Sequence, residues 1–236
     1  MRKHLLAAAL LASLAGCQSG DAPTAPSTST EQAGQSQADA QFAELSKKAL
    51  DTWMQLSPVS ATQIGDHRYD SQLDDVSAAG QQKSLEASKA LLAELDTLDV
   101  SKLGRENQVD AAILRNQLQS DIWSNETMQS WKWDPQVYNG LAGSAIYGLM
   151  AREFAPLPER LKSATARIEK IPQIFAAARA NLDPARVPKI HAETVARQNR
   201  GILSLVATFI TPNLDQLQGQ QRQRLEAAIT TLEAAV

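Results

Sequence analysis

The chain has 236 residues, of which 43% are hydrophobic and 21% are charged, and its formal net charge at pH 7 is −3. This length suffices for one sizeable helical core. A mildly acidic chain without a cluster of basic residues argues against nucleic acid as a partner and against a polybasic helix on a membrane surface. Three histidines and one cysteine leave little material for metal binding or thiol chemistry.

Residues 1–16 have the pattern of a secretory signal peptide. Two basic residues precede the apolar run 5–14, which is too short to cross a hydrocarbon core that needs roughly 20 residues. The run ends in residues 14–17 (LAGC), which are similar to the bacterial lipobox, where cysteine receives a diacylglycerol and acyl chains such as palmitate. We expect Cys17 to anchor the protein stably in a membrane. An ordinary signal peptide with a coincidental cysteine is the alternative.

Gln18 follows this cysteine and sets the expected localisation. In a Gram-negative bacterium, a residue other than Asp at this position directs a lipoprotein to the outer membrane, where it faces the periplasm. Because Cys17 is the single cysteine, lipidation leaves no thiol for a disulfide, a zinc site or a nucleophile. Residues 19–38 contain no aliphatic side chain larger than alanine, so we expect residues 17–38 to form a lipidated, flexible tether.

Residues 39–236 predict an all-α domain, an antiparallel array or bundle of about six to eight helices with no sheet. Apolar residues recur at helical spacing in 39–56, 77–98, 105–131 and 188–210, and again around 225–232. Ser57 and Pro58 predict an N-cap and first turn of a short helix, which Gly65 would end. Residues 134–154 contain three glycines that disfavour helix by up to ~1 kcal/mol each, which predicts a broken helix.

The clearest helical pattern lies in residues 157–182. Leu161, Ile168, Phe175 and Leu182 follow a seven-residue step, which predicts an apolar seam buried against neighbouring helices. Pro172 interrupts the seam, so the helix must kink or restart there. At the other end of the domain, residues 227–236 continue an amphipathic pattern without a stop signal, and we expect this domain to be the N-terminal part of a longer one.

Three stretches together resemble the bacterial "domain of unknown function 885" family of helical envelope proteins. They run from Ser57-Pro58 to Leu73-Asp74, from Val137-Tyr138 to Arg152-Glu153-Phe154-Ala155-Pro156, and from Arg160-Leu161 through Ile171-Pro172 to His191-Ala192-Glu193-Thr194. Each motif is weak alone, but their shared order covers residues 40–236. The resemblance implies a longer, all-helical protein similar to zinc metallopeptidases, with a His-Glu-x-x-Pro-Gly-His signature in its second half.

This sequence contains no such signature. His67 and His191 each lack a neighbouring glutamate followed by a second histidine, so we expect no catalytic residues and no metal ligands in this chain. Zinc is expected only if the chain continues to the family's metal motif. His191 and Glu193 point to different faces of a helix and cannot form a pair of ligands.

The residues that we expect to line a cleft are Asp66, His67, Arg68 and Tyr69, together with Tyr138 and Tyr147, whose glycine neighbours would admit a ligand closely. The alternative for the first four is a solvated loop with local hydrogen bonds. Trp123, Trp131 and Trp133 form either a stacking platform or ordinary packing between helices, and the latter is more common.

The leading interpretation is a lipid-anchored envelope protein that forms the N-terminal, non-metal half of a metallopeptidase-like lipoprotein. Its helices would form one wall of a peptide cleft without hydrolytic activity of their own. The alternative is a complete, non-enzymatic helical lipoprotein that binds an envelope partner. The sequence does not indicate the oligomeric state.

Overall fold

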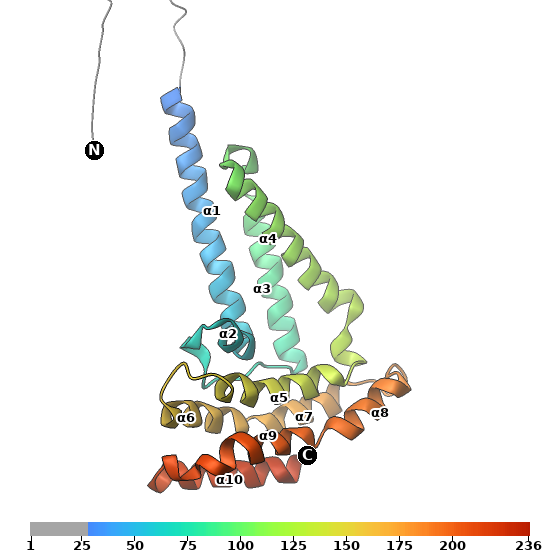
Figure 1. Ribbon diagram of the computed structural model, residues 1–236. Helices are drawn as coiled ribbons and strands as arrows, with labels where there is room; N and C mark the ends of the chain where they lie inside the picture. The colour runs from blue at the N-terminus through green and yellow to red at the C-terminus, as the bar shows by residue number, and fades with distance from the viewer. Residues whose placement is uncertain (1–27) are drawn as a thin grey trace, which may run out of the picture.

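The computed structural model describes residues 28–236, and only helices and loops occur in that range (Figure 1). Eight α-helices of ten residues or more and two shorter ones follow one another, which confirms the all-α prediction. None of the helices in this range combines the length and apolar character needed to cross a bilayer. The predicted signal peptide, Cys17 and the first part of the tether lie outside the described residues.

The first helix, α1 (Thr28–Leu56), begins earlier than the predicted start at Asp39. Residues 28–38 are therefore helical, which corrects the prediction of a flexible tether for this part of 17–38. Glu, Gln and Ala have high helix propensities, and extending an existing helix avoids the cost of nucleation. The first large apolar side chains of α1 that are buried are Phe42 and Leu45.

Three helices form one unit with its own core, namely α1, α3 (Ala78–Asp96) and α4 (Arg105–Trp123). Figure 1 shows them standing on a layer of the remaining helices, with α1 and α4 diverging toward that layer. Asp39 links α1 to α4, because its Oδ1 accepts hydrogen bonds from Gly104 N at 2.9 Å and Asn107 Nδ2 at 2.7 Å. The fully or nearly fully buried side chains of this unit are Phe42, Leu45, Ala49, Leu91, Leu95, Leu103, Ala111, Leu114 and Leu118.

The short helix α2 (Pro58–Ile64) follows α1 directly. Gly65 ends it with a φ of 94°, the left-handed conformation that glycine adopts without strain, as predicted. The predicted cap at Ser57 is wrong in one respect, because the Ser57 side chain makes no capping hydrogen bond. Asp74 supplies the acceptor instead, with Val59 N donating to its Oδ2 at 3.0 Å.

The expected broken helix over residues 134–154 is wrong, since α5 (Gln136–Met150) is continuous through Gly140, Gly143 and Gly148. A Cβ at Gly143 would lie 3.8 Å from Leu205 Cδ1, which is ordinary contact. Burial of a large side chain stabilises a helix by more than one glycine destabilises it, so α5 tolerates these glycines. The buried side chains of α5 include Tyr138, Ala142, Ala145, Ile146, Leu149 and Met150.

The seam predicted over residues 157–182 is divided between α6 (Leu157–Ile168) and α7 (Ile171–Asn181). Pro172 lies in the first turn of α7, where a missing N–H costs nothing, so the predicted restart is confirmed. The prediction that the seam is buried is also confirmed, for Leu161, Ala164, Ile168, Ile171 and Phe175.

The C-terminal part of the chain contains three further α-helices. The predicted helix over residues 188–210 is interrupted and consists of α8 (Lys189–Gln198), α9 (Gly201–Leu205) and a π-helical turn. The last helix, α10 (Gly219–Ala235), packs against α6 and α7. Short 3-10 and π turns connect the helices: η1 (His67–Tyr69), η2 (Val100–Lys102), η3 (Ser124–Met128), η4 (Ser130–Lys132), η5 (Val206–Ile210) and η6 (Thr211–Gln216).

A fully buried arginine joins α6 to α2, α5 and the loop after η1. Arg167 donates to Gln72 O at 2.8 Å, Ala145 O at 3.2 Å, Pro58 O at 3.0 Å and Thr62 Oγ1 at 2.6 Å. Burial lowers the pKa of this guanidinium to about 10. The arginine thus ties four separate segments together in the second, larger core.

Candidate functional site

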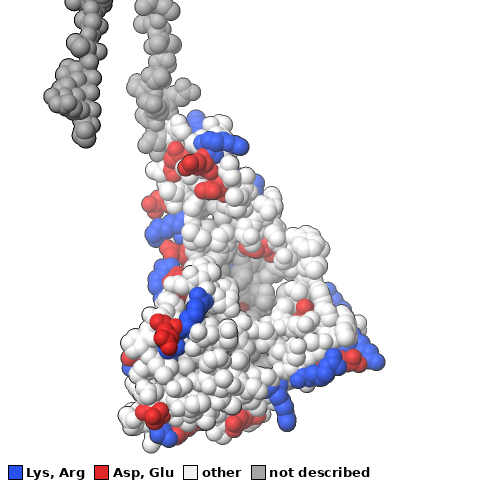
Figure 2. All heavy atoms as spheres, in the orientation of Figure 1, with Lys and Arg blue, Asp and Glu red and all other residues white. Residues whose placement is uncertain are grey.

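A cavity of about 600 Å³ lies where α1, α3 and α4 diverge above α5. Its walls come from the end of α1, the first half of α3, the end of α4 with η3, and the start of α5. The molecular surface is hollowed between α1 and α4, and that hollow is mostly uncharged (Figure 2). The cavity exists because α1, α3 and α4 share a core only in the part that lies away from α5.

Polar but uncharged side chains dominate the polar part of the cavity wall, and no Lys, Arg or His is among the described residues that line it. Asp121 on α4 is the one charged side chain in this lining. Apolar walls are provided by Leu85, Leu91 and Val137. The hydroxyl and amide groups belong to Thr52, Ser57, Ser60, Gln81, Ser84, Ser88, Gln117, Ser124, Asn125 and Ser130.

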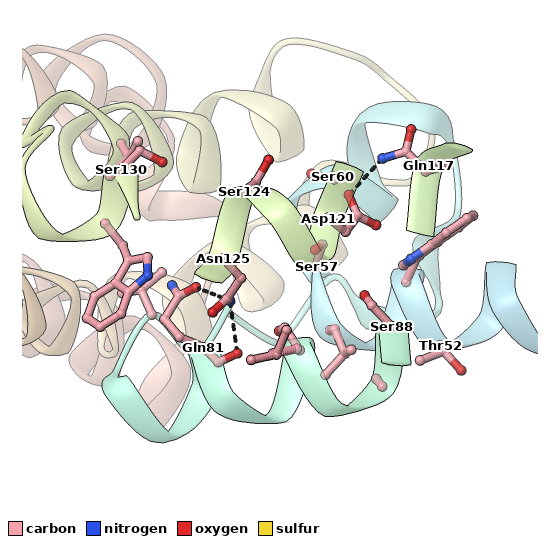
Figure 3. Close-up of a pocket in the computed structure, with 18 of the residues that line it drawn as sticks. Thr52, Ser57, Ser60, Gln81, Ser88, Gln117, Asp121, Ser124, Asn125 and Ser130 are labelled. Carbon is pink, nitrogen blue, oxygen red and sulfur yellow. Dashed lines mark hydrogen bonds between the residues drawn. The ribbon is translucent and has the colours of Figure 1, made fainter. Parts of the chain in front are cut away.

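Asp121 is partly desolvated and has one hydrogen bond. Gln117 Nε2 donates to its Oδ1 at 2.8 Å, and no basic group of residues 28–236 lies within 4.0 Å of it. Burial raises the pKa of this carboxyl group, and the hydrogen bond from Gln117 offsets only part of that effect. Figure 3 shows the pair Gln117–Asp121 and, about one helical turn further along the same stretch of chain, Asn125 bonded to Gln81 of α3.

Two buried indole N–H groups in the wall lack acceptors. Neither Trp53 Nε1 nor Trp131 Nε1 has a hydrogen-bond partner among the described residues, and both side chains line the cavity. A buried donor without a partner costs roughly 1–3 kcal/mol. Both nitrogens are themselves buried, so they are enclosed by neighbouring side chains and are not open to a molecule in the cavity.

The rim of the cavity has an unusual backbone. α4 continues into the π turn η3, and Gln129 after it has a φ of 49°, a left-handed conformation that side chains other than glycine rarely adopt. Asn125 in this turn donates to Gln81 O at 3.1 Å and thereby holds the turn to α3. π turns and strained residues of this kind concentrate at functional sites.

The cluster Asp66–Tyr69 does not line this cavity. Asp66 caps η1 by accepting from Arg68 N, and Arg68 also pairs with Asp51 on α1 at 2.8 Å. His67 stacks on Phe154 with ring centroids 3.6 Å apart. Asp66, Arg68 and Tyr69 line two other hollows along α1, so the structure matches the alternative of local hydrogen bonds and places these residues at a separate surface.

The two tyrosines also separate. Tyr138 is among the residues that line the cavity, and its hydroxyl donates to Trp131 O at 2.5 Å and accepts from Asn181 Nδ2 at 3.1 Å. Tyr147 is 54% exposed and packs edge-on against Phe209, outside the cavity. The six predicted cleft residues therefore do not form one site.

The tryptophan platform considered from the sequence is not assembled either. Trp123 is 53% exposed, and Trp133 donates its indole N–H to Met128 O at 2.8 Å, so of these three only Trp131 lines the cavity. Asp121 and Trp53 were missed because they lie far from each other along the chain. The available signal was a row of small polar residues, Ser84 and Ser88, on one face of α3.

The described residues do not fit a zinc site. His67 Nδ1 lies 3.0 Å from Asp70 Oδ2, and His191 Nδ1 lies 3.0 Å from Asp134 Oδ1, so each histidine is engaged by a single carboxylate in a different part of the fold. No group of three or more His, Cys, Asp or Glu side chains within residues 28–236 could hold a metal ion.

Comparison with known proteins gives a structural neighbour and a family. A candidate lipoprotein of unknown function from Shewanella oneidensis has a similar structure, with a TM-score of 0.77 and 31% sequence identity. The match covers 82% of this chain and 35% of the Shewanella chain, so the present chain spans about a third of that protein. No curated protein matches significantly. The profile of the DUF885 family, "bacterial protein of unknown function", matches residues 58–236, and the chain therefore belongs to this family, as its motifs predicted.

Proposed function

We propose that this protein is a cell-envelope lipoprotein whose helical domain binds a peptide in the cavity between α1, α3, α4 and α5. The observation that carries the proposal is a cavity of about 600 Å³ whose wall combines apolar side chains with hydroxyl groups, amide groups and one carboxylate. This volume is within the range of small-ligand sites, roughly 300–1,000 Å³. Lipidation of Cys17 would hold the domain at the envelope, on the periplasmic face of the outer membrane in a Gram-negative cell.

A peptide suits the wall for a chemical reason. Its backbone presents alternating N–H and C=O groups, which the amides and hydroxyls of the wall can satisfy from Gln81, Asn125 and Ser88. Its side chains can bury apolar area against Leu85 and Val137. The wall therefore offers both kinds of contact that a short peptide requires.

The experiment fills the cavity and measures peptide capture. Ser84→Phe places a ring into the cavity, and Lys83→Phe places the same ring on the exposed side of α3 as the matched control. The probe is a mixture of tripeptide amides with uncharged side chains. Equilibrium dialysis followed by mass spectrometry should show at least tenfold weaker peptide retention by Ser84→Phe and unchanged retention by the control. Equal retention by both variants would place peptide binding elsewhere.

We further propose that this chain contributes binding and not hydrolysis. The described residues offer no zinc site, and the similar Shewanella protein is much longer than the present chain. Any zinc and any hydrolytic activity would then belong to a segment with the family's metal motif. Zinc analysis and a peptide hydrolysis assay of this chain test the idea, and stoichiometric tight zinc or chelator-sensitive hydrolysis would contradict it.

The anchor is tested separately by fractionation of cells that express the chain. Cys17→Ala should abolish incorporation of labelled palmitate and release the protein from the membrane fraction, whereas Ser19→Ala should change neither. In a Gram-negative host, Gln18→Asp should move the protein from the outer to the inner membrane. Membrane retention of Cys17→Ala without any lipid label would show that another feature anchors the protein.

A further inference from the structure

Three large apolar side chains are exposed at one corner of the molecule, where η3 meets the start of α8. Trp123 is 53% exposed, Met128 42% and Ile190 61%. Met128 follows Trp123 by five residues, the spacing of one π-helical turn, so both lie on the same side of this stretch. Trp133 connects them to α8, because its Nε1 donates to Met128 O at 2.8 Å and its ring lies 5.8 Å from that of His191. Apolar side chains gathered at one exposed place mark interaction sites, whereas singly scattered ones do not.

Basic side chains of the α7–α8 loop and of α8 border the same corner. Arg186 lies beside the end of η3, because its Nη1 donates to Gln129 Oε1 at 3.3 Å. Lys189 begins α8, and Arg197 lies about two turns later on the same face. Neither Arg186 nor Arg197 forms a salt bridge within the described part of the chain. Figure 2 shows blue side chains along the position of α8, at the lower right of the molecule.

These residues form a local excess of positive charge. Residues 179–200 contain five basic and two acidic side chains, a net charge of +3, whereas the whole chain has a net charge of −3. Of the two acids, Glu193 lies 3.6 Å from Lys189, and Asp183 accepts a hydrogen bond from Ala185 N. This excess corrects the expectation, drawn from the overall charge, that the chain has no cluster of basic residues.

An exposed tryptophan and aliphatic side chains beside unpaired arginines match the surface of an anionic bilayer. Tryptophan is enriched at the interface between a bilayer and water, and apolar side chains next to it enter the boundary of the acyl chains. Each basic residue near an anionic bilayer strengthens binding by about fivefold. We propose that the corner formed by Trp123, Met128 and Ile190, with the basic residues of α8, binds the surface of a bilayer that contains anionic lipids.

The proposed lipid anchor, on which the inference rests for its bilayer, places a membrane within reach of this corner. Residues 17–27 separate the predicted lipidated cysteine from the start of α1 and can span at most about 40 Å. α1 has 29 residues and is about 43 Å long. In Figure 1 its first turn and α8 lie at opposite ends of the molecule. A connection of this length lets the domain lie with α8 against the membrane that holds Cys17, so the contact orients the domain while the lipid anchors it.

Flotation with lipid vesicles tests the proposal without the anchor. The protein is the chain from residue 17 onward with Cys17→Ala, which carries no lipid and keeps the whole described fold. Vesicles of two parts phosphatidylcholine to one part phosphatidylglycerol should bind it at least tenfold more tightly than pure phosphatidylcholine vesicles, and added salt should weaken this binding. Ile190→Ser and Lys189→Gln should each weaken binding by about fivefold.

The chain offers a matched control for each of these two variants. Ile64→Ser alters an isoleucine that is 71% exposed at the end of α2 and should leave vesicle binding unchanged. Lys162→Gln should also leave it unchanged, although Lys162, like Lys189, is an exposed lysine paired with one glutamate of its own helix. Its helix α6 lies at the opposite end of the lower layer from α8 (Figure 1).

Tryptophan fluorescence locates the contact on the protein. Trp123 is more exposed than the other three tryptophans, so its emission should shift to the blue when vesicles bind. Trp123→Phe keeps an apolar ring and should preserve binding while it removes most of this shift. An unchanged shift in Trp123→Phe would place the contact elsewhere and overturn the proposal.

Three other results would overturn the proposal. They are equal binding to neutral and anionic vesicles, no binding to either, and full binding by Ile190→Ser and Lys189→Gln. Self-association that Ile190→Ser abolishes, without vesicle binding, would assign the corner to a second copy of the chain and overturn it as well. Circular dichroism shows whether each variant is folded, and the comparison of the two vesicle types needs no substitution in the domain. Because the assay uses an unlipidated chain, its failure leaves the proposed anchor and the peptide cavity untouched.

Discussion

Replacing Arg167 by methionine should destabilise the fold more than most single substitutions. The guanidinium is fully buried and donates four hydrogen bonds, three to backbone carbonyls and one to Thr62 Oγ1. Thr62 in turn donates to Asp70 Oδ1 at 2.6 Å, so the positive charge also compensates a buried carboxylate. Methionine fills part of the volume but leaves these acceptors without their donor.

The expected loss follows from these contacts. Removing one member of a buried charged network costs about 3–5 kcal/mol, because hydrogen bonds from a charged donor are worth roughly 1.5–3 kcal/mol each and some acceptors keep helical partners. For a domain of this size that loss corresponds to a melting temperature roughly 6–20 °C lower.

Urea unfolding followed by circular dichroism at 222 nm measures the change. Arg179→Met, an exposed change on α7, serves as the control and should alter stability by less than about 0.5 kcal/mol. A loss below about 1 kcal/mol for Arg167→Met with an unchanged m-value would show that the network contributes little, and that the argument from buried acceptors is wrong.

Two further predictions concern the core and the pH dependence. Ile168→Ala should cost about 2–5 kcal/mol in urea unfolding, because Ile168 is fully buried in the α6 seam, and a change below about 0.5 kcal/mol would mean that the seam is not packed. Burial raises the pKa of Asp74 above its ordinary value of 3.8, so the native state binds more protons than the unfolded chain, and this group's contribution to stability is lost as the pH rises through the raised pKa. Asp74→Asn keeps an acceptor for Val59 N but does not titrate, so its stability relative to the unaltered protein should be higher at pH 7 than at pH 4, and the opposite trend in urea unfolding would contradict the assigned direction.

Local patterns predicted the helices well wherever the decisive interactions are local. The seven-residue step from Leu161 to Phe175 predicts a buried apolar seam whichever helices pack against it. The restart of the helix at Pro172 follows from the missing N–H of proline. The prediction failed where tertiary burial overrides propensity. The three glycines in α5 did not break the helix, because the side chains between them are buried against several neighbouring helices and this burial outweighs the low helix propensity of glycine.

The candidate site was largely beyond the reach of the sequence. Its polar wall combines the end of α1, the face of α3 and the end of α4, which lie far apart along the chain. The conspicuous polar cluster Asp66–Tyr69 instead satisfies itself locally, through Asp66 with Arg68 and His67 with Asp70. A dense polar motif in one loop was thus a weaker guide than scattered serines on one helix face.

The sequence by itself determined the helical class, the seam of α6 and α7, the family and the expected lipidation site at Cys17. Each of these depends on residues that are close in the chain or on a local motif. Only the tertiary structure decided that α1, α3 and α4 share a core at one end and diverge at the other. That divergence creates the cavity and places Asp121 in its wall, with Gln117 as its hydrogen-bond partner. The physical reason is that burial and hydrogen-bond satisfaction depend on which distant segments meet, and spacing along one helix does not specify them.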